Sequence, residues 1–318
     1  MEIEILTAES LGVRGLCCFI KSGDKKILID PGISLGYRRH GLLPHPFQVS
    51  ADEQIQKKII ERWNESTDII MSHFHGDHIP LKDANPYQLS LKKVKDKSDA
   101  NFWCKGVNSL SQVMLKRYND LSEVFKLENA QGRSFSVFNF STPVPHGEAG
   151  DDSNTVMMTA IREGNFTFVH ASDIQLLNNK AVDIILSWSP DIVLADGPPL
   201  YLSEMFDSSK HGADAAKRLK TAWQNAEKLA NNVDILIIDH HLMRNFEGIK
   251  WLKRLNGQGK KVMCAADFMK KPRMLLEARR TELYKKMPIP EGWHKDYTRG
   301  KVSTEPYKIK ASKIYKER

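Results

Sequence analysis

Four side chains of metal-binding type stand within six positions of the segment MSHFHGDHIP: they are His73, His75, Asp77 and His78. The segment directly follows a short apolar run, which predicts that a strand ends where this loop begins. Residues at i and i+2 leaving a strand point the same way, so His73 and His75 can converge on one cation. Asp77 and His78 come from the turn that follows and face a second position. One loop of this kind can begin two metal sites.

The same segment resembles the HxHxDH motif of the metallo-β-lactamase superfamily. The resemblance implies an αβ/βα sandwich of two mixed sheets flanked by helices, with the metal site at one edge between the sheets. Further segments in the order that the family expects extend the resemblance over about residues 1–265. They supply Asp30 as a support for the metal loop, His146, Asp173, and either His240 or His241. His240 is preferred because it follows an apolar run and one aspartate.

The resemblance also implies a ligand set for two divalent ions. One ion takes His73, His75 and His146, the other takes Asp77, His78 and His240, and Asp173 bridges them. Zinc suits these donors best, with iron or manganese as alternatives. A water between the ions is the expected nucleophile, because a divalent ion can lower the pKa of bound water to about 7. Asp77 is the candidate catalytic residue, since it can also orient this water.

Differences between this sequence and several branches of the superfamily reduce the number of branches that it can resemble. The second histidine of the motif, His75, disfavours oxygen reductases, which typically carry glutamate there. Asp173 in place of a bridging cysteine argues against a secreted β-lactamase. The 67 residues from Asp173 to His240 are too few for the inserted cap domain of the RNA-processing branch. The pattern is most similar to the uncharacterised predicted hydrolases of archaea in this superfamily.

These features predict a metal-dependent hydrolase, and the sequence leaves its substrate open between phosphodiesters and small esters or lactones. A nucleic-acid-binding or scaffold protein with a structural metal site is the alternative from another class, although every expected ligand is present. Redox or persulfide chemistry on a single iron is a third reading. Metal content separates that reading from a two-metal hydrolase.

The formal charge of +8 over 318 residues is unevenly distributed. Residues 270–318 contain 15 basic and 6 acidic residues and carry +9, so the preceding residues carry −1. The lysines are spread out, which favours a solvated helix and tail over a nucleic-acid patch. No apolar stretch predicts a membrane span or a signal peptide. We therefore expect a cytoplasmic protein, whose oligomeric state the sequence does not determine.

Helical and strand-like segments alternate along the chain. Helical spacing of apolar residues occurs over 51–63, 110–125, 210–231 and 269–287. Short apolar runs predict strands over 2–6, 15–20, 25–30, 67–72, 134–140, 155–161, 166–170, 191–196, 234–239 and 260–265. Their grouping predicts two facing sheets in a single domain over 1–318, with a basic C-terminal helix and arm from about 266. The four cysteines lack metal-site spacing, and Cys17 and Cys18 should point to opposite faces of a strand.

A few polar residues outside the motifs are weaker candidates. His40 and His45 could contact substrate from a loop before the first long helix, although a plain loop is the simpler interpretation. Asp196 and Tyr201 follow a strand end, where α/β proteins place ligand-binding loops. His170 is better explained as a buried histidine behind the metal site.

Overall fold

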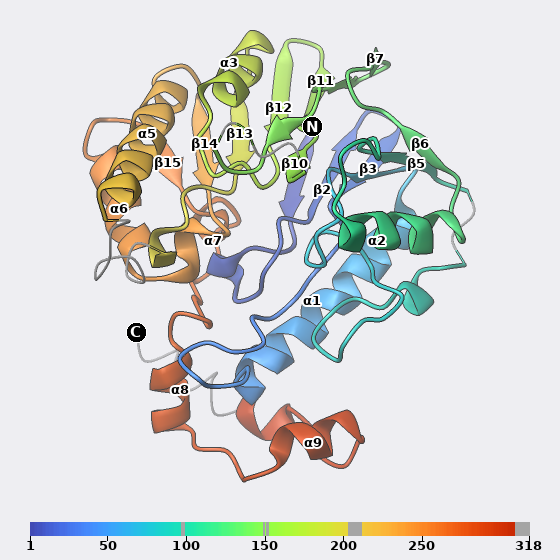
Figure 1. Ribbon diagram of the computed structural model, residues 1–318, viewed down its shortest axis with the longest axis vertical. Helices are drawn as coiled ribbons and strands as arrows, with labels where there is room; N and C mark the ends of the chain where they lie inside the picture. The colour runs from blue at the N-terminus through green and yellow to red at the C-terminus, as the bar shows by residue number, and fades with distance from the viewer. Residues whose placement is uncertain (97–98, 149, 151–152, 203–211, 309–318) are drawn as a thin grey trace.

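Two β-sheets face one another between layers of helices in the computed structural model (Figure 1), which describes residues 1–96, 99–148, 150, 153–202 and 212–308. Ile29 and Ile70 of one sheet share a core cluster with Ala160 and Phe168 of the other. Their neighbour Leu28 belongs to a second cluster on the outer face of its sheet. This alternation follows from the pleat of a strand, which sends successive side chains to opposite faces.

The first sheet has six strands in the order of the chain: β1 (Glu2–Ile5), β2 (Cys18–Ser22), β3 (Lys25–Ile29), β4 (Asp68–Met71), β5 (Asn101–Cys104) and β6 (Leu127–Asn129). The first three pair antiparallel, and β3 to β6 pair parallel. Parallel pairing brings the carboxyl ends of β3 and β4 to one edge, where Asp30 and the histidine loop follow.

The second sheet has seven strands in the order β15-β14-β13-β12-β11-β8-β7. Their bounds are β7 (Ser134–Phe135), β8 (Phe138–Phe140), β11 (Thr159–Glu163), β12 (Phe166–His170), β13 (Ile192–Ala195), β14 (Ile235–Ile238) and β15 (Val262–Met263). The strands from β12 to β15 pair parallel. A separate pair, β9 (Val144–Pro145) and β10 (Thr155–Val156), lies beside His146. Asp173, Asp196 and the two adjacent histidines follow the ends of β12, β13 and β14.

Helices cover the outer side of each sheet (Figure 1). On the first sheet these are α1 (Pro46–Glu65) and α2 (Gln112–Ser122), and on the second α3 (Asn179–Ser187), α5 (Gly212–Ala230) and α6 (Glu247–Asn256). Trp63 of α1 packs on Phe102 of β5 at a ring separation of 5.9 Å. The arrangement confirms the predicted αβ/βα sandwich of two mixed sheets.

Several predicted elements differ from those observed. The run 134–140 is a hairpin, because Ser136 has a left-handed φ of 50° between β7 and β8. The run 155–161 divides into β10 and β11. Strands β5 and β6, and helices α3 and α6, were not predicted, and each of them is short. Residues 210 and 211 of the predicted helix 210–231 lie outside the described residues.

The helix predicted over 269–287 was wrong in its first half. Only α8 (Arg280–Lys286) is helical there, because Lys270 and Leu275 adopt left-handed φ values of 52° and 41°. Two short helices, α7 (Ala265–Phe268) and α9 (Trp293–Thr298), complete this part of the chain together with α8.

The C-terminal segment packs on the body as an arm. Trp293 and Tyr307 are 4% and 8% exposed and lie in the core cluster of the first sheet. The hydroxyls of Tyr297 and Thr304 donate to Glu53 of α1. Basic side chains of the arm form ion pairs with nearby carboxylates, among them Arg273–Asp267, Arg279–Glu282, Lys286–Glu282 and Lys308–Glu305. Residues 309–318, with four basic side chains, lie outside the described residues.

All four cysteines are buried and free, and Cys17 and Cys18 belong to opposite core clusters, as their alternation predicted. Among the described residues, we find no helix with the length and apolar character needed to cross a membrane. The single-domain organisation stays a prediction.

Candidate metal centre

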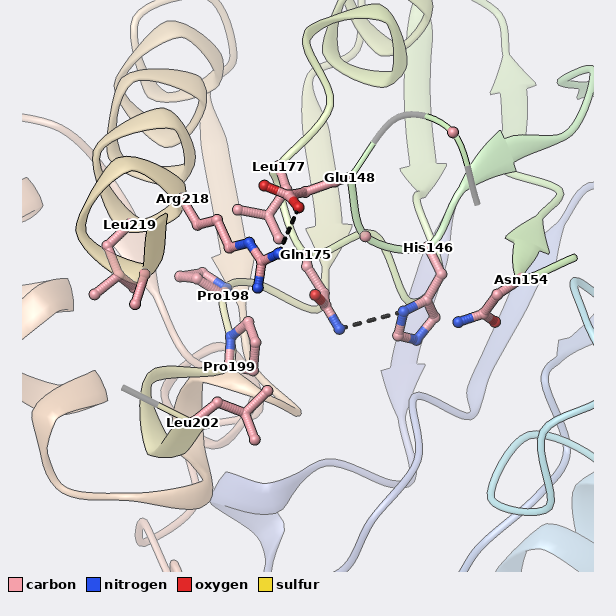
Figure 2. A pocket seen from close by; sticks show the side chains of 13 residues that line it. His146, Glu148, Asn154, Gln175, Leu177, Pro198, Pro199, Leu202, Arg218 and Leu219 are labelled. Carbon is pink, nitrogen blue, oxygen red and sulfur yellow. Dashed lines mark hydrogen bonds and ion pairs between the residues drawn. The ribbon is translucent and has the colours of Figure 1, made fainter. Parts of the chain in front are cut away.

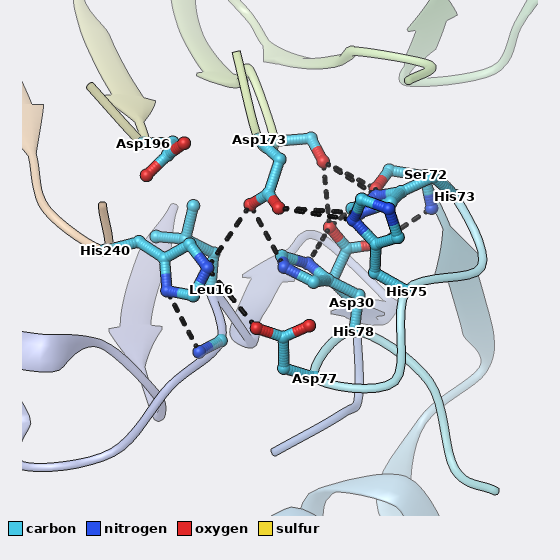
Figure 3. Close-up of polar contacts among 12 residues, drawn as sticks. Leu16, Asp30, Ser72, His73, His75, Asp77, His78, Asp173, Asp196 and His240 are labelled. Carbon is cyan, nitrogen blue, oxygen red and sulfur yellow. Dashed lines mark hydrogen bonds and ion pairs between the residues drawn. The ribbon is translucent and has the colours of Figure 1, made fainter. Parts of the chain in front are cut away.

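The histidine loop leaves β4 at Met71 and turns at the edge between the two sheets (Figure 3). The side chains of His73 and His78 are fully buried, whereas those of His75 and Asp77 are 27% and 18% exposed. Gly32 allows the loop to pass closely, because a Cβ on it would lie 2.2 Å from the backbone nitrogen of Ile79. His73 and His78, at the two ends of the motif, are thus buried, and the middle of the loop is partly exposed.

The carboxylate of Asp173 lies at the centre of the cluster, and each of its oxygens faces a different group of histidines (Figure 3). Oδ2 is 3.5 Å from His73 Nε2 and 3.2 Å from His146 Nε2, and it is 3.8 Å from His75 Nδ1. Oδ1 is 3.0 Å from His78 Nε2 and 3.8 Å from His240 Nε2. Asp173 therefore stands between two sets of nitrogen donors.

The donor atoms fit divalent metal ions. Nε2 of His73, Nε2 of His78 and Oδ1 of Asp173 are buried and have no hydrogen-bond partner, which is costly unless another ligand satisfies them. Several groups of described residues have donor atoms within 4.8 Å of one another, among them His73, His75 and Asp173, and Asp77, His78 and His240. Imidazole and carboxylate donors in such groups suit zinc and related cations.

Charges within the cluster stabilise the ionised form of Asp173. Burial acts to raise the pKa of Asp173, but the charges of His78 and His240 and the hydrogen bond from His146 outweigh it. The pKa of Asp173 therefore lies well below its usual range. A permanently ionised carboxylate is the form that bridges cations.

Asp30 orients the loop from behind and is itself fully buried. Its carboxylate accepts hydrogen bonds from the backbone N–H of Ser72 (2.8 Å) and the hydroxyl of Ser72 (2.6 Å), and it lies 3.1 Å from His78 Nδ1. Burial acts to raise the pKa of Asp30, but the hydrogen bond and charge of His78 outweigh it and lower the pKa to about 2. With Nδ1 of His78 held in this way, its Nε2 is directed at the centre.

Both His240 and His241 have a ring nitrogen close to other candidate donors of the cluster, although the sequence favoured His240 alone. His240 has a left-handed φ of 44°, which breaks the alternation of a strand. A ring nitrogen of His241 lies within 4.8 Å of donor atoms of His146 and Asp173. Asp196 accepts hydrogen bonds from the backbone N–H and from Nδ1 of His241. His241 is therefore a further candidate donor, held by a carboxylate.

Of the weaker candidates from the sequence, some lie at or near the site and others contribute only to packing. His45 is buried as the N-cap of α1, with Nε2 2.8 Å from the Met287 carbonyl oxygen, and so contributes to packing. His170 is buried with Nε2 2.8 Å from the Leu16 carbonyl oxygen, as expected for a histidine behind the site. The ring of Tyr201 stacks on His241 at 6.2 Å. His40 is exposed and lines a small cavity beside Arg244.

Two residues of the site carried no sequence signal. Arg244 lies next to His240 and Asp77, at 2.9 Å and 3.8 Å from their nearest ring nitrogen and carboxylate oxygen. The side-chain amide of Gln175 lies 3.2 Å from Nδ1 of His146. Their proximity depends on turns after β14 and β12, which no spacing pattern predicted.

A cavity of about 440 Å³ opens beside His146 (Figure 2). Apolar side chains such as Leu177, Leu202 and Leu219 form part of its wall, and an ion pair of Arg218 with Glu148, at 2.8 Å, forms another part. A volume of this size suits a small organic molecule. The His146 side of the centre therefore adjoins a compartment of mixed polarity.

Comparisons with known proteins identify the relatives of this chain. No family model matches it. Among solved structures, it is similar to the metallo-β-lactamase fold protein YhfI from Bacillus subtilis, at 14% identity, covering 82% of this chain and 95% of that one, with a TM-score of 0.49. A UPF0282 protein of Methanosarcina mazei is 44% identical over 310 residues, covering 96% of this chain and 99% of the relative.

A UPF0282 protein of Thermococcus sibiricus is 32% identical over 323 residues, which cover 92% of this chain and 100% of that relative. Another, from Korarchaeum cryptofilum, is 33% identical and covers 92% of this chain and 97% of its own length. These archaeal relatives agree with the archaeal branch that the motifs suggested. The chain belongs to the UPF0282 family.

Proposed function

We propose that this UPF0282 protein is a metal-dependent hydrolase with two divalent ions, most suitably zinc. The observation that carries the proposal is the position of Asp173, whose two oxygens face separate groups of histidine nitrogens. The first ion would be held by His73, His75 and His146, and the second by Asp77, His78 and His240, with Asp173 shared between them. His241 is an additional donor beside the first group.

Divalent ions in such a site supply an activated water at neutral pH. The residues of the chain orient and protect this chemistry. Asp77 is partly exposed in the middle of the loop, where its carboxylate could accept a hydrogen bond from the attacking water. Asp30 and Asp196 hold the rings of His78 and His241 from behind. Burial of His73 and His78 keeps bulk water from the inner side.

The cavity beside His146 favours a small substrate with an apolar portion. Small esters and lactones are therefore better candidate substrates than long polyanions. Phosphodiesters of small molecules remain within the proposed range. The packed C-terminal arm with its ion pairs weakens the case for a nucleic-acid partner. A nucleic-acid-binding or scaffold protein with a structural metal is the alternative, and it predicts bound metal without turnover.

The test combines metal analysis with substrate screening. Protein purified without added metal is analysed by elemental mass spectrometry and then assayed with bis-p-nitrophenyl phosphate, a thioester and a lactone. We expect about two ions per chain and turnover of at least one substrate that is lost on chelation and restored by zinc. Tight metal binding without turnover of any substrate would favour the structural alternative. A single iron would instead favour redox chemistry.

A further inference from the structure

Arg244 is a buried arginine that presents its terminal nitrogens to the proposed metal centre. The residue is 6% exposed and ends the short helix η3 (Leu242–Arg244) after His240. Its Nε donates to Oε1 of Glu9 at 3.2 Å, and the Glu9 side chain is itself 1% exposed. This contact anchors one edge of the guanidinium and leaves both terminal amino groups free to face the site.

One of the two terminal groups, Nη2, would lose its nearest partner once a metal is bound. Nη1 donates to the hydroxyl of Tyr201 at 3.2 Å, and Nη2 lies 2.9 Å from Nε2 of His240. An ion on Nε2 of His240 would deprive Nη2 of this contact. A buried donor next to the centre then requires another acceptor.

Arg39 approaches the same place from a different loop. Its guanidinium carbon lies 5.2 Å from the ring centre of Tyr201, and that of Arg244 lies 5.6 Å from the same ring. Nε of Arg39 is buried and has no hydrogen-bond partner. Arg39, His40 and Arg244 line a cavity of about 200 Å³. Glu247 is the acidic residue among the described lining residues, and it already pairs with Lys250 at 2.6 Å.

We propose that Arg39 and Arg244 form a subsite for an anionic oxygen group, a carboxylate or a phosphoryl group, carried by the substrate. The inference rests on the proposed hydrolase function and narrows its substrates to anions. Guanidinium groups suit this role because their planar fork binds two oxygens at once. Arg244 pairs with Glu9 and lies 3.8 Å from the Asp77 carboxylate, so the positive charge left for a ligand to neutralise is mainly that of Arg39, whose buried Nε–H has no partner.

Anion binding is measured first, without any activity. Full-length, zinc-loaded protein is titrated with inorganic phosphate and separately with acetate by calorimetry, and the two affinities show which oxyanion the subsite prefers. We expect Arg39→Gln and Arg244→Gln to weaken the preferred anion by about ten-fold or more, the loss expected for one charge-assisted hydrogen bond. Arg38→Gln is the matched control, since Arg38 is an exposed neighbour that donates to the Gly41 carbonyl oxygen. It should bind as the wild type does.

Circular dichroism and thermal melting check that each variant folds. Arg244 is buried, so Arg244→Gln can destabilise the chain. In that case the test depends on Arg39→Gln, because Arg39 is only half-buried. Arg244→Lys keeps the charge but loses the fork, and it should retain part of the affinity. Equal anion binding by wild type and folded Arg39→Gln, or no anion binding by the wild type, would overturn the proposal.

A kinetic experiment separates this inference from the hydrolase proposal. Zinc-loaded protein is assayed with p-nitrophenyl butyrate, which is neutral, and with mono-p-nitrophenyl glutarate, which carries a carboxylate. We expect the ratio of kcat/KM for the anionic over the neutral ester to fall about ten-fold in Arg39→Gln and to be unchanged in Arg38→Gln. An unchanged ratio in Arg39→Gln would reject the subsite while leaving the hydrolase intact. Absence of turnover by the wild type, together with anion binding lost in Arg39→Gln, would reject the hydrolase and retain the subsite.

Discussion

The carboxylate of Asp196 holds His241 at two points, the backbone N–H and the ring nitrogen Nδ1. The carboxylate comes from the end of β13 and the histidine from the end of β14, two strands that pair in parallel. A proton on Nδ1 leaves Nε2 as the acceptor nitrogen of the ring. The contact thus prepares His241 as a donor towards the proposed centre.

Replacing Asp196 by asparagine should loosen this arrangement without changing the size of the side chain. We expect metal affinity to fall about 10-fold to 100-fold, the usual effect of losing a residue that orients a ligand. The measurement is zinc affinity by competition with a chromogenic chelator. Asp183→Asn is the control, because Asp183 is an exposed residue of α3 that pairs with Lys228. Unchanged zinc affinity in Asp196→Asn would mean that His241 lines the site without binding metal.

Single alanine variants of the adjacent histidines should both lower metal content, since both rings reach the cluster. His240→Ala should empty the position shared with Asp77 and His78, and His241→Ala should weaken the position beside His146. Cobalt substitution with visible spectroscopy distinguishes the two sites by their ligand fields. His294→Ala is the control, since His294 lies in the arm and contacts Tyr87. Full occupancy after His240→Ala would reject it as a ligand.

Substitution of Asp173 should affect both ions. Its two oxygens face different donor groups, so Asp173→Ala should reduce bound zinc from about two ions per chain to fewer than one. Asp173→Asn tests whether charge or shape matters, because the amide keeps the size of the carboxylate. Elemental analysis after gel filtration provides the count. Retention of one full ion in both variants would show that Asp173 serves a single site.

The stability of the protein should depend on pH through Asp52, a fully buried residue of α1. Burial raises the pKa of Asp52 to about 7, although its Oδ2 accepts a hydrogen bond from Gln56 at 2.8 Å. The folded state therefore binds a proton that the unfolded state releases above about pH 4, so this group lowers stability as pH rises from about 4 to about 7. The full loss is roughly 4 kcal/mol.

Asp52→Asn should remove that loss. We expect the variant to exceed the wild type in stability at pH 8 and to approach it near pH 4, as measured by urea unfolding across this range. Asp24→Asn, at an exposed position between β2 and β3, is the control and should follow the wild type at every pH. A stability difference that does not change with pH would contradict the assignment of a raised pKa to Asp52.

Truncating Trp293 to alanine should destabilise the whole protein, because this residue joins the arm to the core. It stacks on Tyr297 at 5.1 Å and meets Tyr307 edge to face at 6.0 Å. A buried tryptophan cut to alanine costs about 3–5 kcal/mol, which thermal or urea unfolding detects readily. Val113→Ala on α2 is the control, since Val113 is 59% exposed. An equal, small effect of both variants would mean that the arm is dispensable for folding.

Local features of the sequence determined which donors are present and most of the strands that position them. The HxHxDH spacing puts four ligand-type residues after one strand, and each remaining candidate follows an apolar run that is now a strand or adjoins one. Such runs can be recognised in the sequence, because the alternation of side chains along a strand and their burial depend on a few neighbouring residues. The opposite burial of Cys17 and Cys18 follows from the same alternation.

Only the tertiary structure decided how those donors meet. His240 and His241 share the centre because one left-handed residue, His240 itself, reverses the alternation at the end of β14. Arg244 and Arg39, far apart in sequence, flank one tyrosine ring because the loop before α1 and the turn after β14 meet there. Backbone turns and contacts between distant segments depend on the packing of the whole chain, and no local periodicity encodes them.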